Sequence, residues 1–134
     1  MKVLIVDDEP LAVQRLQKML DECEGYRCVG TAANGIEALA KIEQLQPDIT
    51  LSDIRMPDMD GIALATAVKA NSLYRTVLVF TTAYEDHAMQ AFDLDASGYL
   101  LKPVSKDKLS QALQRAAKLV DNSKKVETRH YLTA

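Results

Sequence analysis

The feature that most constrains the fold is a series of short, nearly unbroken apolar runs separated by stretches with helical spacing. Val3-Leu4-Ile5-Val6 and Val77-Leu78-Val79-Phe80 are the clearest of these runs. A strand exposed on one face alternates apolar and polar residues, whereas a strand buried on both faces does not. The runs therefore predict buried parallel strands at residues 2–7, 26–32, 48–53, 76–82 and 98–101.

Helical patterns lie between and after these strands. Pro10 directly follows acidic residues and favours a helix start, whereas Pro47 ends the second helical stretch. The last helix has one apolar face, formed by Leu109, Ala112, Leu113, Ala116 and Leu119 or Val120. Five strand–helix units predict right-handed crossovers and an α/β fold with a doubly wound, five-stranded parallel sheet and five helices. The common strand order for this count is 2-1-3-4-5.

The length of 134 residues suits a single domain, which we expect to span residues 1–121. From about Asn122 the sequence is mostly polar and loses its periodicity. We interpret residues 122–134 as a linker toward an absent output domain.

Acidic residues follow two of the predicted strands. Asp7 and Asp8 end the first strand and Asp53 ends the third, and the expected strand order places these ends side by side. Three adjacent carboxylates repel one another unless a proton or a hard cation lies among them. Lys102, at the end of the fifth strand, would reduce the charge of −3 to −2, which matches one Mg²⁺ ion. Such a site suits phosphoryl transfer, with Asp53 as the best nucleophile.

Four motifs then occur in register: VLIVDDEP, LSDIRMPDMDG, FTTAY and SGYLLKP. In this order and spacing they resemble the receiver domain of two-component response regulators, over residues 1 to about 121. The resemblance implies the flavodoxin-like, CheY-like version of the predicted fold. The strings DDEPLAVQRL, FTTAYEDHAMQAF and KPVSKDKL are most similar to receivers of LytTR-type (LytR/AlgR-like) transcription regulators.

The resemblance also implies a role for each motif residue. Asp53 would be the phosphoacceptor, and Lys102 and Thr82 would contact the phosphoryl group. Mg²⁺ would be held by Asp8 directly, by Asp7 mostly through water, by Asp53 and by the backbone carbonyl of Arg55. Thr82 is preferred over Thr81 because the small residue Ala83 follows it. Thr82 and Tyr99 would form the switch, Lys102-Pro103 would be a cis peptide, and Asp60-Gly61 would begin the third helix.

The implied function is a phosphorylation-dependent switch of a two-component system, not an enzyme beyond its own phosphorylation and dephosphorylation. A sensor histidine kinase would phosphorylate Asp53. The face formed by the fourth helix, fifth strand and fifth helix would change and support a homodimer. The switch would control a LytTR DNA-binding domain and transcription, so DNA would be contacted only through the absent output domain.

Two other functions stay open. A stand-alone phosphorelay carrier would lack an output domain, which the polar tail argues against. A Mg²⁺-dependent aspartyl phosphohydrolase would need an acid two residues after its nucleophile on the first strand, and Asp7-Asp8-Glu9-Pro10 lacks that spacing. Asp7 and Asp8 taken alone could simply favour the N-terminus of the next helix.

Composition excludes other classes. The net charge of −3 gives no electrostatic reason for direct nucleic-acid or membrane binding, and no apolar stretch reaches the roughly 18 residues of a membrane span. The N-terminus shows no signal-peptide pattern. Cys23 and Cys28 lack a metal-type spacing to His87 or His130, so we expect free thiols in a cytoplasmic protein.

Overall fold

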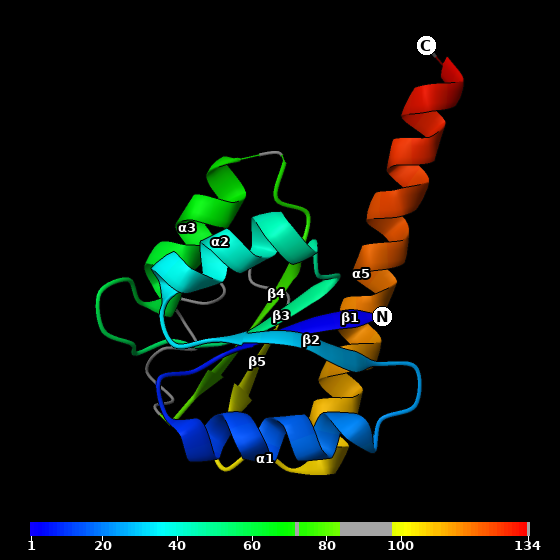
Figure 1. The fold of residues 1–134 in the computed structure, drawn as a ribbon. Helices are drawn as coiled ribbons and strands as arrows, with labels where there is room; N and C mark the ends of the chain where they lie inside the picture. The colour runs from blue at the N-terminus through cyan, green and yellow to red at the C-terminus, as the bar shows by residue number, and fades with distance from the viewer. Residues whose placement is uncertain (72, 84–97, 134) are drawn as a thin grey trace.

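Five parallel strands form one sheet in the order β2-β1-β3-β4-β5, as predicted (Figure 1). The computed structural model describes residues 1–71, 73–83 and 98–133, with side chains described as far as Asp121. Each strand lies within one residue of its predicted range: β1 (Lys2–Val6), β2 (Arg27–Ala32), β3 (Ile49–Asp53), β4 (Val77–Thr82) and β5 (Gly98–Leu101).

The described residues contain four helices, namely α1 (Pro10–Asp21), α2 (Gly35–Leu45), α3 (Gly61–Ala70) and α5 (Lys106–Thr133). The expected fourth helix, with His87, falls on residues 84–97, which lie outside the described residues. Figure 1 shows α2 and α3 on one face of the sheet and α1 and α5 on the other. The fold is therefore the expected flavodoxin-like arrangement.

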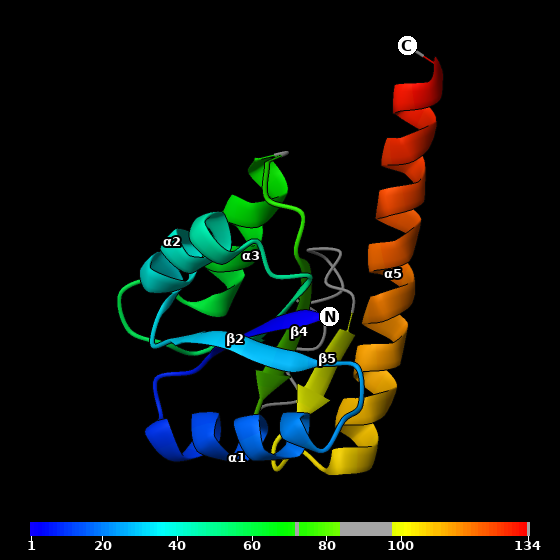
Figure 2. The same cartoon turned by 45° about the vertical axis from the view of Figure 1, so that its right-hand side comes forward.

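The backbone of α5 continues as a helix through the segment that the sequence indicated as a linker, to Thr133. Figure 2 shows this part of α5 extending past the sheet. Among the helices whose placement is described, none combines the length and the apolar composition that crossing a bilayer requires.

The central strands are buried on both faces. In β1, Val3 and Ile5 belong to the core beneath α1 and α5, whereas Leu4 and Val6 belong to the core beneath α2 and α3. Consecutive side chains of a strand point to opposite faces. This explains why the run that predicted β1 shows no polar alternation.

Local signals place the helix starts near the carboxyl edge of the sheet. Pro10 occupies the first turn of α1. Asn34 and Asp60 cap α2 and α3, where their side chains accept hydrogen bonds from the backbone N–H groups of Glu37 (2.9 Å) and Ala63 (2.8 Å). The segments that carry the candidate site residues are thus fixed at their helical ends.

Candidate functional site

Three carboxylates meet at the carboxyl edge of the sheet. Asp7 and Asp8 directly follow β1, and Asp53 is the last residue of the adjacent strand β3. One carboxylate oxygen from each of the three residues lies within 4.8 Å of the others. The predicted meeting of these distant acids is confirmed in the structure.

Lys102 supplies a positive charge to this cluster. Its Nζ donates hydrogen bonds to Asp7 Oδ2 at 2.8 Å and to Asp53 Oδ2 at 3.3 Å. Its backbone N–H donates to the carbonyl of Thr82 at 2.7 Å, which ties the segment after β5 to the end of β4. The Lys102-Pro103 peptide is cis, as the resemblance implied.

Asp7 is the most constrained of the three acids. Its Oδ1 accepts a hydrogen bond from the backbone N–H of Glu9 at 2.9 Å, and its Oδ2 accepts from Lys102. Its side chain is fully buried, whereas Asp8 is exposed. Sequence reasoning missed the contribution of Glu9. An aspartate whose side chain accepts from the N–H two residues on is a common turn, so this signal was available.

Burial and neighbouring charges shift the pKa values of Asp53 and Lys102, which are in contact. Burial raises the pKa of Asp53 above its ordinary value, and the charge of Asp7 adds to this rise, while Lys102 opposes it. For Lys102, burial acts to lower the pKa, but the hydrogen bond to Asp7 and the charges of both acids raise it overall. Lys102 therefore stays protonated, and keeping Asp53 ionised in the folded state costs free energy.

The donor set fits a hard divalent cation. Carboxylate oxygens are the ligands that Mg²⁺ prefers, and it usually takes one or two of them together with water. Asp8 and Asp53 have oxygens directed to the shared cluster, whereas both oxygens of Asp7 already accept hydrogen bonds. Cys23 and Cys28 are free thiols, as predicted, and take no part in this cluster.

The remaining predicted residues lie around this cluster. Thr82 is the last residue of β4 and is buried. Tyr99 lies in β5, pairs with Phe80 and packs against the core beneath α2 and α3. Arg55 lies two residues after Asp53, with its side chain exposed. Thr82 and Arg55 are thus at the carboxyl edge, at the end of β4 and just beyond β3, whereas Tyr99 lies within β5, further from that edge.

Gly61 allows α3 to begin directly against the end of β3. Its N–H donates to the carbonyl of Ile54 at 2.8 Å. A Cβ atom at this position would lie 2.3 Å from the carbonyl oxygen of Asp53 and 2.9 Å from Ile54 Cα. Both neighbours are backbone atoms, so neither can move aside without displacing Asp53. The Asp60-Gly61 pair is therefore important for the site as well as for the helix start.

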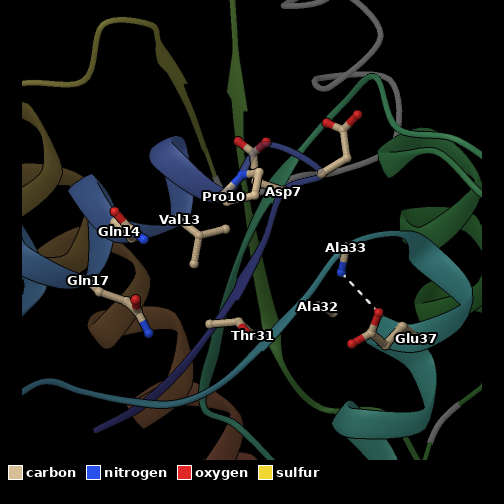
Figure 3. A pocket seen from close by; sticks show the side chains of 10 residues that line it. Asp7, Pro10, Val13, Gln14, Gln17, Thr31, Ala32, Ala33 and Glu37 are labelled. Carbon is tan, nitrogen blue, oxygen red and sulfur yellow. Dashed lines mark hydrogen bonds between the residues drawn. The ribbon is translucent and has the colours of Figure 1, made fainter.

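Two hollows lie on either side of α1, one lined by Asp7 and Asp8 and the other by Lys102. The first, of about 340 Å³, is lined by Asp7 and Asp8 and by side chains of α1, β2 and α2. Figure 3 shows Gln14 and Gln17 of α1 facing Thr31 of β2 and Glu37 of α2 across it. The second, of about 550 Å³, reaches Lys102 between α1 and Pro103. Asp7, Asp8 and Lys102 are therefore each open to a surface hollow.

Residues 3–114 match the family profile described as "Response regulator receiver domain". The chain is 45% identical over 119 residues to the "Positive alginate biosynthesis regulatory protein" of Pseudomonas aeruginosa, covering 88% of this chain and 48% of that protein. It is 38% identical over 114 residues to the "Transcriptional regulatory protein BtsR" of Escherichia coli, covering 85% and 47%. The chain thus spans about half the length of these curated relatives.

Solved structures agree with this match. The response regulatory domain of mrkE from Klebsiella pneumoniae superimposes with a TM-score of 0.81 at 32% identity, covering 91% of this chain and 99% of that one. CheY from Borrelia burgdorferi, in a complex with CheX, BeF3 and magnesium, gives a TM-score of 0.76 at 29% identity, covering 84% and 86%. On these matches and this fold, the chain belongs to the receiver domain family of response regulators.

Proposed function

We propose that this chain is a phosphorylation-dependent signalling switch in which Asp53 accepts the phosphoryl group. The observation that carries the proposal is the meeting of Asp7, Asp8, Asp53 and Lys102 at one edge of the sheet. A buried carboxylate beside a fixed ammonium and two further acids suits nucleophilic attack on phosphorus more than simple helix capping.

The bonds made and broken in the transfer step involve only Asp53 and the phosphodonor. An Asp53 oxygen forms the new P–O bond while the bond from phosphorus to the leaving group of the donor breaks. The leaving group keeps the electron pair: the imidazole of a phosphohistidine takes up a proton from water, whereas the acetate of acetyl phosphate leaves as the anion. Lys102, which lies 3.3 Å from Asp53, would neutralise charge on the phosphoryl oxygens. In a two-component system the donor would be a phosphohistidine of a sensor kinase.

A bound Mg²⁺ ion would supply charge neutralisation at the phosphoryl oxygens. Asp8 and Asp53 would bind it directly, and the backbone carbonyl of Arg55 would complete the protein ligands. Asp7 would act mostly through water, as the resemblance implies, while its oxygens also hold Lys102 Nζ and the backbone N–H of Glu9.

The switch would act through Thr82 and Tyr99. Thr82 would bond the phosphoryl group and draw its loop inward, and Tyr99 would then change rotamer. Phosphorylation would shift an existing equilibrium between two conformations. The affected face would include the segment between β4 and β5, together with β5 and α5, and would support a homodimer.

The similarity to the transcriptional regulatory protein BtsR supports a role in regulating transcription. Since the chain spans about half of their length, we assign residues 1–121 to the receiver and residues 122–134 to a connection toward a LytTR DNA-binding domain. DNA would then be bound only by that domain. This cytoplasmic protein would have no membrane partner and no enzymatic activity beyond its own phosphorylation and dephosphorylation.

The test is incubation with Mg²⁺ and acetyl phosphate, followed by intact-mass measurement. We expect one long-lived phosphoryl adduct in the wild type and none in Asp53→Asn. Asp21→Asn, which changes an exposed acid of α1, is the matched control and should be phosphorylated normally. Free phosphate accumulating without an adduct would contradict the switch and support a phosphohydrolase.

A second experiment tests Lys102. Lys102→Ala should still bind Mg²⁺ but should not shift dimerisation when Asp53 is phosphorylated, because the phosphoryl group loses its ammonium partner. Dimerisation is measured by sedimentation with and without acetyl phosphate. A shift equal to that of the wild type would show that Lys102 is not needed for the response.

A further inference from the structure

Thr81 carries a buried hydroxyl for which the described residues provide no hydrogen-bond partner. The residue is 1% exposed, and its Oγ1 is unpaired within that part of the chain. Other buried hydroxyls of these strands are paired, since Thr50 and Thr76 bond each other at 2.8 Å and Ser52 donates to the Asp53 carbonyl at 2.9 Å. Burying a hydroxyl without a partner is unfavourable, so an exception calls for a physical reason.

The position of Thr81 supplies that reason. Thr81 pairs in register with Asp53 on the adjacent parallel strand, and its carbonyl accepts a hydrogen bond from the N–H of Ile54 at 3.2 Å. Two residues earlier, Val79 and Leu51 both lie in the core beneath α1 and α5. Because side chains alternate along a strand, Thr81 and Asp53 also point to that face. The unpaired hydroxyl is therefore the lateral neighbour of the Asp53 carboxylate.

Asp53 has capacity to accept a further hydrogen bond. A carboxylate offers about four acceptor positions, and the contact from Lys102 to Asp53 is long, at 3.3 Å. Lys102 bonds Asp7 more closely, at 2.8 Å. When Lys102 turns to an incoming phosphoryl group, Asp53 loses this donor. A threonine hydroxyl can take its place by a rotation between staggered χ1 positions.

We propose that Thr81 is a positioning residue for Asp53. Its hydroxyl donates to the Asp53 carboxyl group during phosphoryl transfer and holds the attacking oxygen in line with phosphorus. The inference rests on the proposed function of Asp53. It gives adjacent hydroxyls separate tasks: Thr82, on the opposite face of β4, serves the phosphoryl group, and Thr81 serves the nucleophile.

The test compares Thr81→Val, which keeps the shape and removes the hydroxyl, with Thr81→Ser, which keeps the hydroxyl. Phosphorylation rates are measured over a range of acetyl phosphate concentrations at saturating Mg²⁺. We expect Thr81→Val to lower the plateau rate by about tenfold, with the half-saturating donor concentration unchanged, because the lost bond acts on attack and not on donor binding. Thr81→Ser should restore the rate to within about twofold.

Thermal unfolding of the same variants separates positioning from packing. Thr81→Val should unfold no earlier than the wild type, since it removes an unpaired buried hydroxyl. Thr76→Val is the matched control: it deprives Thr50 of its partner, so it should unfold earlier but be phosphorylated normally. Thr81→Ala and Thr81→Ser form a second pair that differs in the hydroxyl, and both side chains are smaller than threonine. Comparing these two variants shows the effect of the hydroxyl without depending on how valine packs.

The outcomes are distinct. A wild type that is not phosphorylated on Asp53 contradicts the proposed function itself. Normal phosphorylation of the wild type and of Thr81→Val together overturns the positioning role and leaves the proposed function intact. A slow Thr81→Val that Thr81→Ser does not rescue also overturns it, because packing and not the hydroxyl would then be responsible.

Discussion

Replacement of Lys102 by methionine gives the sharpest test of the electrostatics at the carboxyl edge. Methionine keeps an unbranched apolar chain and removes the ammonium. Asp7, whose side chain is fully buried, then loses one of its two hydrogen bonds, and Asp53 loses its bond to Nζ. The variant therefore leaves two carboxylates without their nearest cation while disturbing the packing little.

The size of the expected loss of stability follows from how far the Asp7 and Lys102 side chains are buried. Removing one partner of a fully buried ion pair costs about 3–5 kcal/mol, and a hydrogen bond to a charged group contributes about 1.5–3 kcal/mol. The Lys102 side chain is 23% exposed, so water replaces part of the lost interaction. We expect a loss of about 2–3 kcal/mol in unfolding free energy in the absence of divalent ions. At about 3–4 °C per kcal/mol for a domain of this size, Tm falls by about 6–12 °C.

The assay is thermal unfolding by circular dichroism at pH 7, first in EDTA and then with increasing Mg²⁺. Lys106→Met is the control, because Lys106 pairs with Glu22 at 3.3 Å with both side chains about half exposed. Such surface pairs contribute only about 0–1 kcal/mol. Mg²⁺ should stabilise Lys102→Met more than the wild type, since the cluster has lost its own cation. Equal Tm values for the two lysine variants in EDTA would refute the reasoning.

Three further predictions follow from the same edge of the sheet. Because burial raises the pKa of Asp53, the folded state favours its protonated form, so the contribution of Asp53 to stability falls as pH rises above about 4. Without divalent ions, Asp53→Asn should therefore have a higher Tm than the wild type at pH 7 but not at pH 3. An equal difference in Tm between the two proteins at both pH values would contradict this. Gly61→Ala should lose about 1–3 kcal/mol in urea unfolding. Gly98→Ala should lose little, because its added Cβ meets no heavy atom of the described residues within 4 Å beyond its chain neighbours; similar losses would disprove the close approach at Gly61. Asp60→Ala should lose about 1 kcal/mol in the same assay through its missing cap, and an unchanged midpoint would show that the cap adds no stability.

The strands and the meeting of the acids were predictable for a simple physical reason. A strand buried on both faces can be apolar throughout, so the run Val3-Leu4-Ile5-Val6 before Asp7 could be recognised without its neighbours. The crossover rule then fixed which strand ends lie side by side, and hence that Asp7, Asp8 and Asp53 approach one another.

The finer features depend on contacts that no local pattern encodes. The contact of Asp7 Oδ2 with Lys102 and the unpaired state of Thr81 within the described residues depend on side chains from separate strands. The helical backbone of residues 122–133 was also not foreseen. A helix without an apolar face leaves no periodic signal, so a polar sequence resembles a flexible linker.

The ammonium of Lys102 is a permanent competitor for any ion that enters the acidic cluster. It is tethered to β5, so it cannot diffuse away, and its local concentration far exceeds that of a free ion. A divalent cation must overcome this resident charge before it binds, which weakens its affinity. Loosely held ions exchange readily, so we expect a divalent cation to bind this cluster weakly and reversibly.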